Sequence, residues 1–145
     1  MNKFMAQALW EAYEGIAKKD GGPFGCVIVK DNEIVGRGHN RVLAKNDCTC
    51  HGEIEAIRDA CKTLNTFDLS GCDLYTTSEP CPMCCGAIQW ANIRKVYQGC
   101  NVKDAEYIGF RDKQFYETDI EVEEVDREDC LVLFDEYRLS NPQNY

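Results

Sequence analysis

The chain has 145 residues, a net charge of −9 and a pI near 4.7. A chain of this length forms one domain around a single core, and no apolar run approaches the ~18 residues of a membrane span. The acidity disfavours a polynucleotide substrate, because proteins that grip a phosphate backbone normally carry a basic stripe. We therefore expect a single domain over residues 1–145 that acts on a small molecule, away from membranes.

The N-terminal segment and the cysteines indicate where the protein works. Residues 1–7 lack an apolar stretch followed by a cleavage site, so we expect no secretory signal and a cytoplasmic location. The chain has ten cysteines together with an ordinary share of hydrophobic residues, 44%. This combination favours metal binding and buried thiols over a framework of disulfides.

The first half of the chain predicts a helix, a hairpin and a second helix. Apolar residues over 4–16 follow the spacing of an amphipathic helix that ends before a Gly-Gly-Pro sequence. Residues 25–30 and 34–38 flank a turn-forming Asp-Asn pair, which predicts a β-hairpin. Over 52–64 the apolar residues recur about every 3.5 positions, which predicts another helix.

The second half of the chain alternates short strands with helices. The predicted elements are a strand over 74–77, a helix from Pro82 to Ala91, a strand over 95–98, a fifth strand over 120–125, a helix over 130–138 and an irregular tail over 140–145. Such an order is typical of an α/β fold. We expect a three-layer α/β/α sandwich, with a mixed five-stranded sheet and helices on both faces.

Two short segments carry the side chains that metal chemistry requires. They are His51-Gly52-Glu53 and Pro80-Cys81-Pro82-Met83-Cys84, each at the start of a predicted helix. Together they spell the H-x-E and P-C-x-x-C pattern of zinc deaminases, in which one His and two Cys hold the metal. Three protein ligands leave the fourth tetrahedral position of zinc open, as in catalytic sites. We expect one Zn²⁺ per subunit, held by His51, Cys81 and Cys84.

The helical repeat separates the neighbouring cysteines and carboxylates. Cys81 and Cys84 are three residues apart at a helix start, where both sulfurs point the same way and the helix dipole favours thiolates. Cys85 is rotated by about 100° and is expected to point elsewhere. Glu53 lies at the edge of the apolar stripe of its helix, whereas Glu55 lies about 140° from the centre of that stripe and is expected to face solvent.

Glu53 is therefore the predicted catalytic residue. Zinc in an open site makes water a nucleophile at neutral pH. Glu53 is expected to take a proton from that water, pass it to the ring nitrogen beside the attacked carbon, and later protonate the departing amine. The predicted reaction converts an amino group on a ring into a carbonyl and releases ammonia.

Other interpretations of the same residues remain open. A Cys-x-x-Cys pair alone could be a structural zinc site, a redox pair or packing. A structural zinc site requires a fourth protein ligand, for which His39 and Cys48 are the candidates. The joint occurrence of the two segments favours the catalytic interpretation.

The chain resembles the guanine deaminase branch of the cytidine deaminase-like superfamily over most of its length, to about Tyr116. The matching segments are Gly22-Pro23-Phe24-Gly25, Asn40, Asn46-Asp47, His51-Gly52-Glu53, Glu79 to Cys84, Gly86-Ala87-Ile88, Trp90-Ala91, Asp104-Ala105, Gly109 to Asp112 and Phe115-Tyr116. The metal pattern is common to the superfamily, so it identifies the chemistry and not the substrate. The resemblance implies a purine or pyrimidine base as substrate, with guanine favoured.

The resemblance also assigns residues to the substrate. It implies that Asn40 and Asp112 hydrogen-bond the edge of the base, that Phe24 and Trp90 pack on its faces, and that Tyr145 closes the pocket. Gly52 is also assigned to substrate binding. Without the resemblance, Asn40 would be read as a turn residue, Phe24 and Trp90 as core residues and Asp112 as a solvated side chain.

A homodimer is a further implication of the resemblance. The C-terminal segment, about 117–145, is expected to exchange between subunits, so that Asp112 and Tyr145 serve the neighbouring site. The alternatives in function are a cytosine deaminase, since residues 36–40 and 74–77 are also similar to the fungal enzyme, and a tRNA adenosine deaminase, which the acidity disfavours. The alternative outside catalysis is an inactive zinc-binding partner of a deaminase, against which Glu53 argues.

Overall fold

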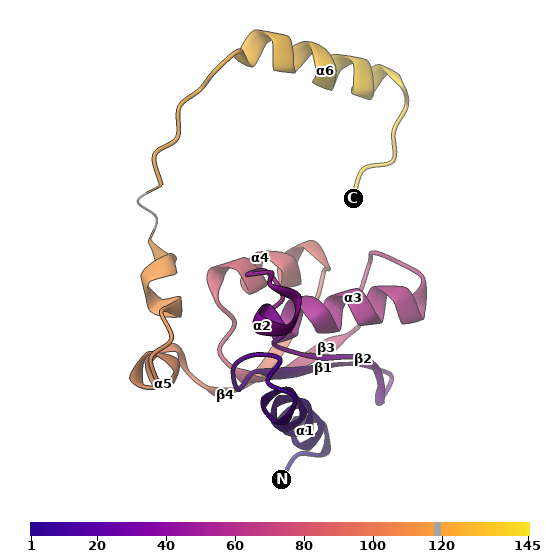
Figure 1. The fold of residues 1–145 in the computed structure, drawn as a ribbon. Helices are drawn as coiled ribbons and strands as arrows, with labels where there is room; N and C mark the ends of the chain where they lie inside the picture. The colour runs from indigo at the N-terminus through magenta and orange to yellow at the C-terminus, as the bar shows by residue number, and fades with distance from the viewer. Residues whose placement is uncertain (118–119) are drawn as a thin grey trace.

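The structure is a computed structural model that describes residues 1–117 and 120–145 (Figure 1). Its elements, in chain order, are α1 (Lys3–Ala17), β1 (Gly25–Lys30), β2 (Glu33–His39), α2 (Val42–Lys45), α3 (Gly52–Leu64), β3 (Asp73–Ser78), α4 (Pro82–Trp90), β4 (Lys95–Cys100), α5 (Val102–Tyr107), the 3₁₀ helix η1 (Asp112–Tyr116) and α6 (Arg127–Leu139). All the predicted helices are present. The two predicted residues of the hairpin turn, Asp31 and Asn32, both adopt positive φ, which suits short polar side chains.

The sheet has four strands in the order β2-β1-β3-β4. β1 pairs antiparallel with both β2 and β3, while β3 and β4 pair in parallel. The prediction of a mixed sheet is confirmed, but the fifth strand is wrong, because residues 120–125 form no strand. Alternating apolar residues favour extended backbone, but a strand also needs a neighbour to pair with. Residues 120–125 instead run away from the sheet (Figure 1).

Helices cover both faces of the sheet (Figure 1). α1 packs on one face, over a cluster that includes Ala8, Val27 and Tyr75. The opposite face carries α3 and α4 over the larger cluster, which includes Ile28 and Leu74. The predicted three-layer arrangement therefore holds.

α3 lies unusually close to β2. A Cβ atom on Gly38 would lie 2.7 Å from the backbone nitrogen of Ala56, so only glycine fits between the strand and the helix. This contact fixes the first turns of α3 against the end of β2. Since His51 and Glu53 stand at the start of α3, the close approach also fixes their positions.

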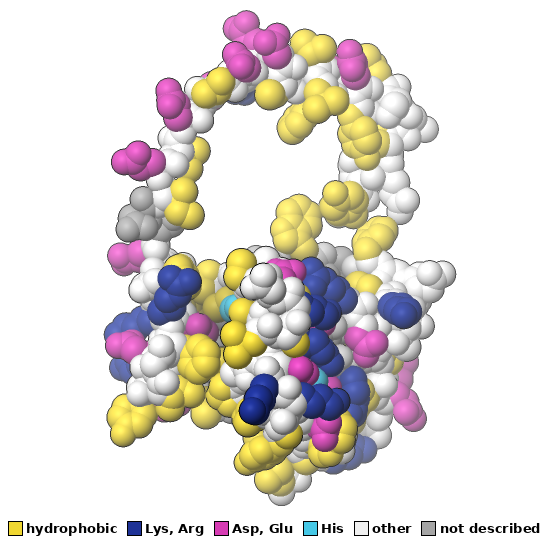
Figure 2. All heavy atoms as spheres, viewed as in Figure 1, with side chains coloured by type: hydrophobic (Ala, Val, Ile, Leu, Met, Phe, Trp, Pro, Cys, Tyr) yellow, Lys and Arg dark blue, Asp and Glu magenta, His cyan; other side chains and the backbone are white. Residues whose placement is uncertain are grey.

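The C-terminal segment stands apart from the domain. Figure 1 shows α6 away from the sheet and its helices, and no α6 residue is buried. Its exposed large apolar side chains are Leu131, Val132, Leu133, Phe134, Tyr137 and Leu139, and Figure 2 shows apolar side chains on the side of this segment that faces the domain. A helix with this much exposed apolar surface is incomplete as an isolated unit. Among the helices of the described residues, none combines the length and the apolar character needed to cross a bilayer.

Candidate metal centre and active site

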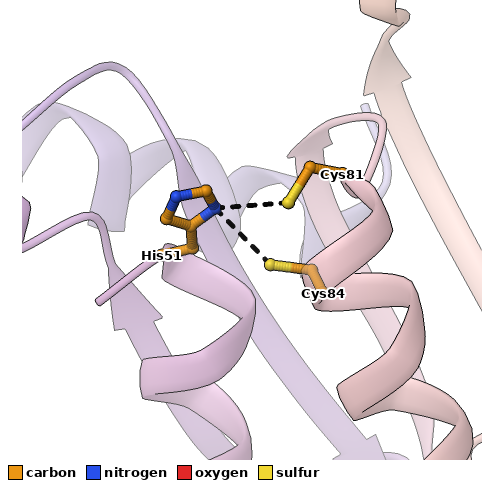
Figure 3. Close-up of side chains that lie close together, drawn as sticks. All are labelled: His51, Cys81 and Cys84. Atoms are coloured by element: carbon orange, nitrogen blue, oxygen red, sulfur yellow. Dashed lines mark hydrogen bonds between the residues drawn. The ribbon is translucent and has the colours of Figure 1, made fainter. Parts of the chain in front are cut away.

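Three predicted metal ligands converge between the starts of two helices (Figure 3). His51 is the N-cap of α3, Cys81 is the N-cap of α4, and Cys84 lies in the first turn of α4. Nδ1 of His51 lies 3.5 Å from the Cys81 sulfur and 3.6 Å from the Cys84 sulfur. Within the described part of the chain, this is the one group of at least three His, Cys, Asp or Glu side chains with ligand atoms within 4.8 Å of one another.

These distances fit a tetrahedral zinc ion. With a Zn–S bond of about 2.3 Å and a Zn–N bond of about 2.05 Å, the tetrahedral angle separates nitrogen from sulfur by about 3.6 Å. The two measured separations agree with this value. His39 is buried beside Glu11 and Asp20, and Cys48 is exposed, so neither joins the cluster as a fourth ligand. The donor set is the one expected for an open, catalytic zinc site.

The electrostatics of the three side chains also suit a cation. A hydrogen bond from Cys84 and the neighbouring His51 lower the pKa of Cys81 to about 4, against the opposing effect of burial. The pKa of Cys84 is raised, because its thiol donates to Cys81, is buried and faces the charge of Glu53. The hydrogen bond to Cys81 raises the pKa of His51. The two pKa values are shifted in opposite directions because the sulfurs lie close together, and a bound cation would allow both to be thiolates.

Glu53 is buried beside this cluster. Burial raises the pKa of its carboxyl group, while contacts with Cys84 and His51 partly oppose the increase. Thr76 in β3 donates a hydrogen bond to Oε1 of Glu53 at 3.3 Å. Thr76 was not predicted as a site residue, although a threonine within a buried strand is a signal for a specific hydrogen bond. A carboxyl group with a raised pKa can both accept and return a proton near neutral pH.

The prediction that Glu55 faces solvent is wrong. Its side chain is buried, and it pairs with Lys45 at 2.9 Å, with Arg41 at 3.3 Å and with Arg58 at 3.3 Å. The helical repeat correctly excluded Glu55 from the apolar stripe, but the segment that carries α2 covers this side of α3. Burial acts to raise the pKa of Glu55, and hydrogen bonds from Lys45 and Cys50 outweigh it, so the pKa is lowered.

The Glu55→Gln variant should be less stable than the wild type at pH 7 by about 1–2 kcal/mol, because charge-assisted hydrogen bonds at a buried carboxylate are lost. A lowered pKa in the folded state means that the carboxylate stabilises the fold above its unfolded pKa. That contribution is lost as the pH falls through the folded pKa. Urea unfolding at pH 7 and near pH 4 should therefore show the difference between the two proteins shrinking in acid. A difference that is constant with pH would contradict this role.

Asn40, Phe24 and Gly52 lie together beside the metal cluster. The N–H of Asn40 donates to the C=O of Phe24 at 2.9 Å, and a Cβ on Gly52 would lie 3.1 Å from the same carbonyl oxygen. Oδ1 of Asn40 accepts from the N–H of Val42 at 3.0 Å, as in an Asx turn. Among the described residues, the Asn40 Nδ2 group has no hydrogen-bond partner. Phe24 packs edge-on against Phe110, with ring centroids 4.8 Å apart.

Asp112 approaches the cluster from the first position of η1. Burial raises the pKa of its carboxyl group, the charge of Cys81 adds to the increase, and His51 opposes it. Tyr116 at the other end of η1 donates to Glu79 at 2.8 Å and to the C=O of Pro80 at 3.2 Å. These hydrogen bonds of Tyr116 hold η1 against the turn that carries Cys81. This role was not predicted, since the residue appeared in the sequence only as part of a matching segment.

Trp90 and Tyr145 do not reach the metal cluster of their own chain. Tyr145 lies beside Trp90 and Phe67, with ring centroids 6.3 Å and 6.0 Å apart. Trp90 ends α4, whose first turn holds the ligand Cys84, and Phe67 follows the end of α3, which begins after His51. At 1.5 Å per residue, the nine residues of α4 separate its two ends by about 13 Å. Trp90 and Tyr145 are both largely exposed, and they lie at the end of α3 and α4 that is remote from the metal cluster.

Comparison with known proteins agrees with the geometry of this site. The model of the cytidine and deoxycytidylate deaminase zinc-binding region matches residues 1–100. The guanine deaminase of Bacillus subtilis (strain 168) is 48% identical over 113 residues, which are 78% of this chain and 72% of that protein. The X-ray structure of guanine deaminase from Bacillus subtilis superposes with a TM-score of 0.93 and 41% identity, covering 100% of this chain and 99% of that one.

A second group of relatives shares a shorter part of the chain. The tRNA-specific adenosine deaminase of Agrobacterium fabrum (strain C58) is 46% identical over 96 residues, which are 66% of this chain and 62% of that protein. The chain therefore belongs to the cytidine and deoxycytidylate deaminase zinc-binding family and is a zinc-dependent deaminase, a hydrolase that acts on C–N bonds.

Proposed function

We propose that this deaminase converts guanine to xanthine and ammonia. The observation that carries the proposal is the extent of the likeness to Bacillus subtilis guanine deaminase, which covers 100% of this chain. A solved tRNA adenosine-34 deaminase covers 68% of it, with a TM-score of 0.64. The likeness to guanine deaminase therefore extends over the part of this chain that the tRNA deaminase structure does not cover. The net charge of −9 also favours a small base over RNA as the substrate.

In this proposal Glu53 moves the protons of the reaction. Zinc, when bound by His51, Cys81 and Cys84, supplies the Lewis acidity that makes water a nucleophile at neutral pH. Glu53 accepts a proton from the attacking water and delivers it to the ring nitrogen beside the reacting carbon. It then takes a second proton from the hydroxyl group that the attack has left on the carbon, and gives that proton to the amino group as the C–N bond breaks and the carbonyl forms. The hydrogen bond from Thr76 holds the carboxylate in place during both transfers.

Asn40, Asp112, Phe24 and Gly52 are the residues that we propose hold the base. The Nδ2 group of Asn40 can donate to a ring carbonyl, and the carboxylate of Asp112 can accept from ring N–H and amino groups. Guanine offers both kinds of group on its edge, whereas adenine has no carbonyl. Phe24 supplies an aromatic surface, and the missing side chain of Gly52 leaves room beside Glu53.

We further propose that the active form is a cytoplasmic homodimer in which the segment of about 117–145 is exchanged. Support comes from the unburied apolar side of α6 and from the distance of Tyr145 from its own metal centre. The apolar side chains of α6 would be covered by a second copy of the chain. Tyr145 would then close the pocket of a neighbouring subunit. Trp90, which lies beside Tyr145, would contact that subunit as well.

Ammonia release from a panel of guanine, cytosine, adenine, their nucleosides and a tRNA anticodon stem-loop tests the proposed substrate. We expect guanine to be turned over with a kcat/KM at least about 100-fold above that of the other compounds. The reason is that a site built to pair buried polar groups rejects a base that leaves them unpaired. Turnover of cytosine alone, or of the stem-loop alone, would overturn the assignment. Absence of turnover in zinc-loaded protein would support the inactive partner instead.

A further inference from the structure

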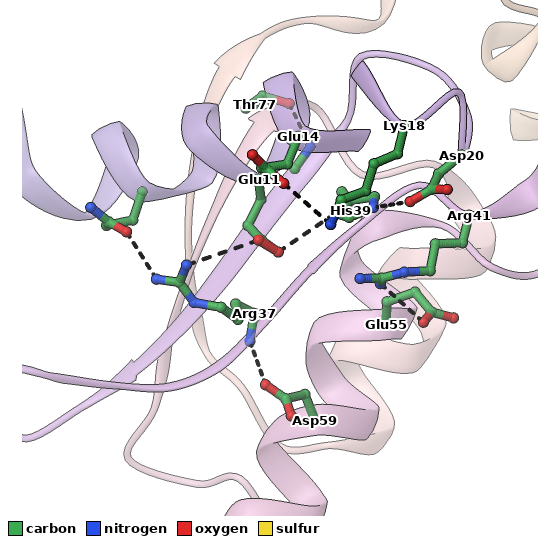
Figure 4. A network of polar contacts seen from close by, with 12 residues as sticks. Glu11, Glu14, Lys18, Asp20, Arg37, His39, Arg41, Glu55, Asp59 and Thr77 are labelled. Atoms are coloured by element: carbon green, nitrogen blue, oxygen red, sulfur yellow. Dashed lines mark hydrogen bonds and ion pairs between the residues drawn. The ribbon is translucent and has the colours of Figure 1, made fainter. Parts of the chain in front are cut away.

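A buried polar cluster on the α1 face of the sheet takes no part in the chemistry proposed above. It joins Glu11 of α1, Asp20 of the following loop and His39 at the end of β2 (Figure 4). Nε2 of His39 lies 2.7 Å from Oδ2 of Asp20, and Nδ1 lies 3.5 Å from Oε1 of Glu11. Burying polar groups costs free energy, and apolar residues often fill such a space at lower cost. Packing alone therefore does not explain this cluster.

Of the two carboxylates in the cluster, Glu11 also pairs with a neighbouring arginine, whereas Asp20 pairs with His39. Arg37, on the same face of β2 as His39, places Nη1 3.9 Å from Glu11 and donates from Nη2 to Gln7 at 2.9 Å. Glu11 is thus shared between His39 and Arg37. Among the described residues, the carboxylate of Asp20 has a side-chain hydrogen bond or ion pair with His39 alone.

Backbone hydrogen bonds connect this pair to the residues proposed to hold the base. Asn40 follows His39 directly, and its N–H donates to the C=O of Phe24 at 2.9 Å. The C=O of Asp20 accepts from two N–H groups of α2, both at 3.0 Å. The side chain of Asn40 accepts from a third N–H group at the start of α2. The loop with Asp20 and Phe24 and the turn with Asn40 are therefore held to each other by main-chain contacts.

The ring of His39 has little freedom to reorient. A Cβ atom on Gly15 would lie 2.6 Å from Cδ2 of the ring, so the backbone of α1 packs directly on it. Polar contacts on one edge and close packing on a face together fix a side chain in one orientation. Because the ring is held in one orientation, the contact with Asp20 also holds the backbone of His39 at the end of β2.

We propose that the contact between His39 and Asp20 positions Asn40 and Phe24 for binding a planar nucleobase, which rests on the substrate site proposed above. His39 and Asp20 are positioning residues that do not touch the base. Asn40 and Phe24 would contact the base both in the ground state and in the transition state. Loosening them therefore weakens substrate binding more than it slows the chemical step.

Asp20→Ala removes the acceptor of His39, and Asp20→Asn is the matched control that keeps an oxygen acceptor at the same place. We expect the KM for guanine to rise about five- to tenfold in Asp20→Ala, as for one lost charge-assisted hydrogen bond, with kcat within about twofold of wild type. Asp20→Asn should restore KM to within about twofold of the wild-type value. Both variants keep the backbone carbonyl that accepts from α2.

A binding measurement separates positioning from general destabilisation. The Glu53→Gln background allows calorimetric titration of zinc-loaded protein with guanine without turnover. Asp20→Ala in this background should raise Kd by the same factor as KM, and Asp20→Asn should not. Equal values for the two variants, or a lower melting temperature with unchanged KM and Kd, would overturn the positioning role.

Asn40→Ala distinguishes this proposal from the one on which it rests. If Asn40→Ala raises KM and Asp20→Ala does not, the positioning role fails while the substrate site stands. If Asn40→Ala leaves KM unchanged, the assignment of Asn40 fails and the positioning role falls with it. Should the wild type deaminate another base of the panel, the same comparison is made with that base. A rise of KM in both Asn40→Ala and Asp20→Ala supports the inference.

Discussion

The Glu53→Gln variant should bind zinc like the wild type and lose about 10²–10⁴-fold in kcat, the usual contribution of a positioned general acid and base. Glutamine has nearly the same shape and can still accept the hydrogen bond from Thr76, so the buried site should remain folded. It cannot take a proton from water. Zinc content by atomic emission and ammonia release at saturating guanine measure the two effects separately.

Two cysteine variants act as controls for this experiment. Cys81→Ala removes a proposed ligand, and we expect it to lose both the metal and the activity. Cys85→Ala should keep both, since the sulfur of Cys85 lies against the C=O of Pro80 at 3.4 Å and belongs to no metal cluster. Turnover by Glu53→Gln equal to that of the wild type at the same zinc content would disprove the role of Glu53.

The metal centre was the part of the molecule most accessible from sequence. Zinc is bound by only a few residue types. The three-residue spacing of Cys81 and Cys84 at the start of α4 places both on one side of the helix. The segment with His51 and Glu53 is equally local, because both residues lie within the first turn of α3 or directly before it. Local periodicity and ligand chemistry were therefore enough to identify the cluster.

Features that depend on distant segments were less predictable. Glu55 was expected in solvent because the helical repeat describes a helix and its core, but not the α2 segment that packs on the opposite side. Residues 120–125 alternate like a strand, but the segment runs away from the sheet and is not one of its four strands. The hydrogen bond from Thr76 to Glu53 joins residues 23 positions apart, which no local pattern encodes.

The residues proposed to hold the substrate also differ in how far their positions depend on distant segments. Asn40 and Phe24 are joined by one backbone hydrogen bond near the metal cluster, as a shared role requires. Trp90 and Tyr145 meet each other instead, at the far end of α3 and α4. Whether Tyr145 acts at the metal centre of its own chain or of a neighbouring subunit depends on how the subunits assemble. Local patterns in the sequence of one chain do not encode that assembly. That question can be tested with two defective chains.

Chains that carry Glu53→Gln and chains that lack Tyr145 should complement each other in a mixed dimer. In the proposed exchange, the chain without Tyr145 keeps its own Glu53 and receives the intact tail of its partner. One of the two sites is then complete, and heterodimers should recover about half of the wild-type activity, as two-fold symmetry requires. Co-expression with two affinity tags and tandem purification isolates these heterodimers for the ammonia assay.

The result depends on the subunit in which Tyr145 acts. If the tail served its own chain, the site with Glu53 would lack Tyr145 and the site with Tyr145 would lack Glu53, so the mixed dimer would stay inactive. Each homodimer provides a control, because both should show only residual activity. Failure to recover any heterodimer, together with a monomer in sedimentation, would remove the exchange itself. Recovery of activity would support the proposed exchange, in which a second copy of the chain covers the unburied apolar face of α6 and receives Tyr145 at its metal centre.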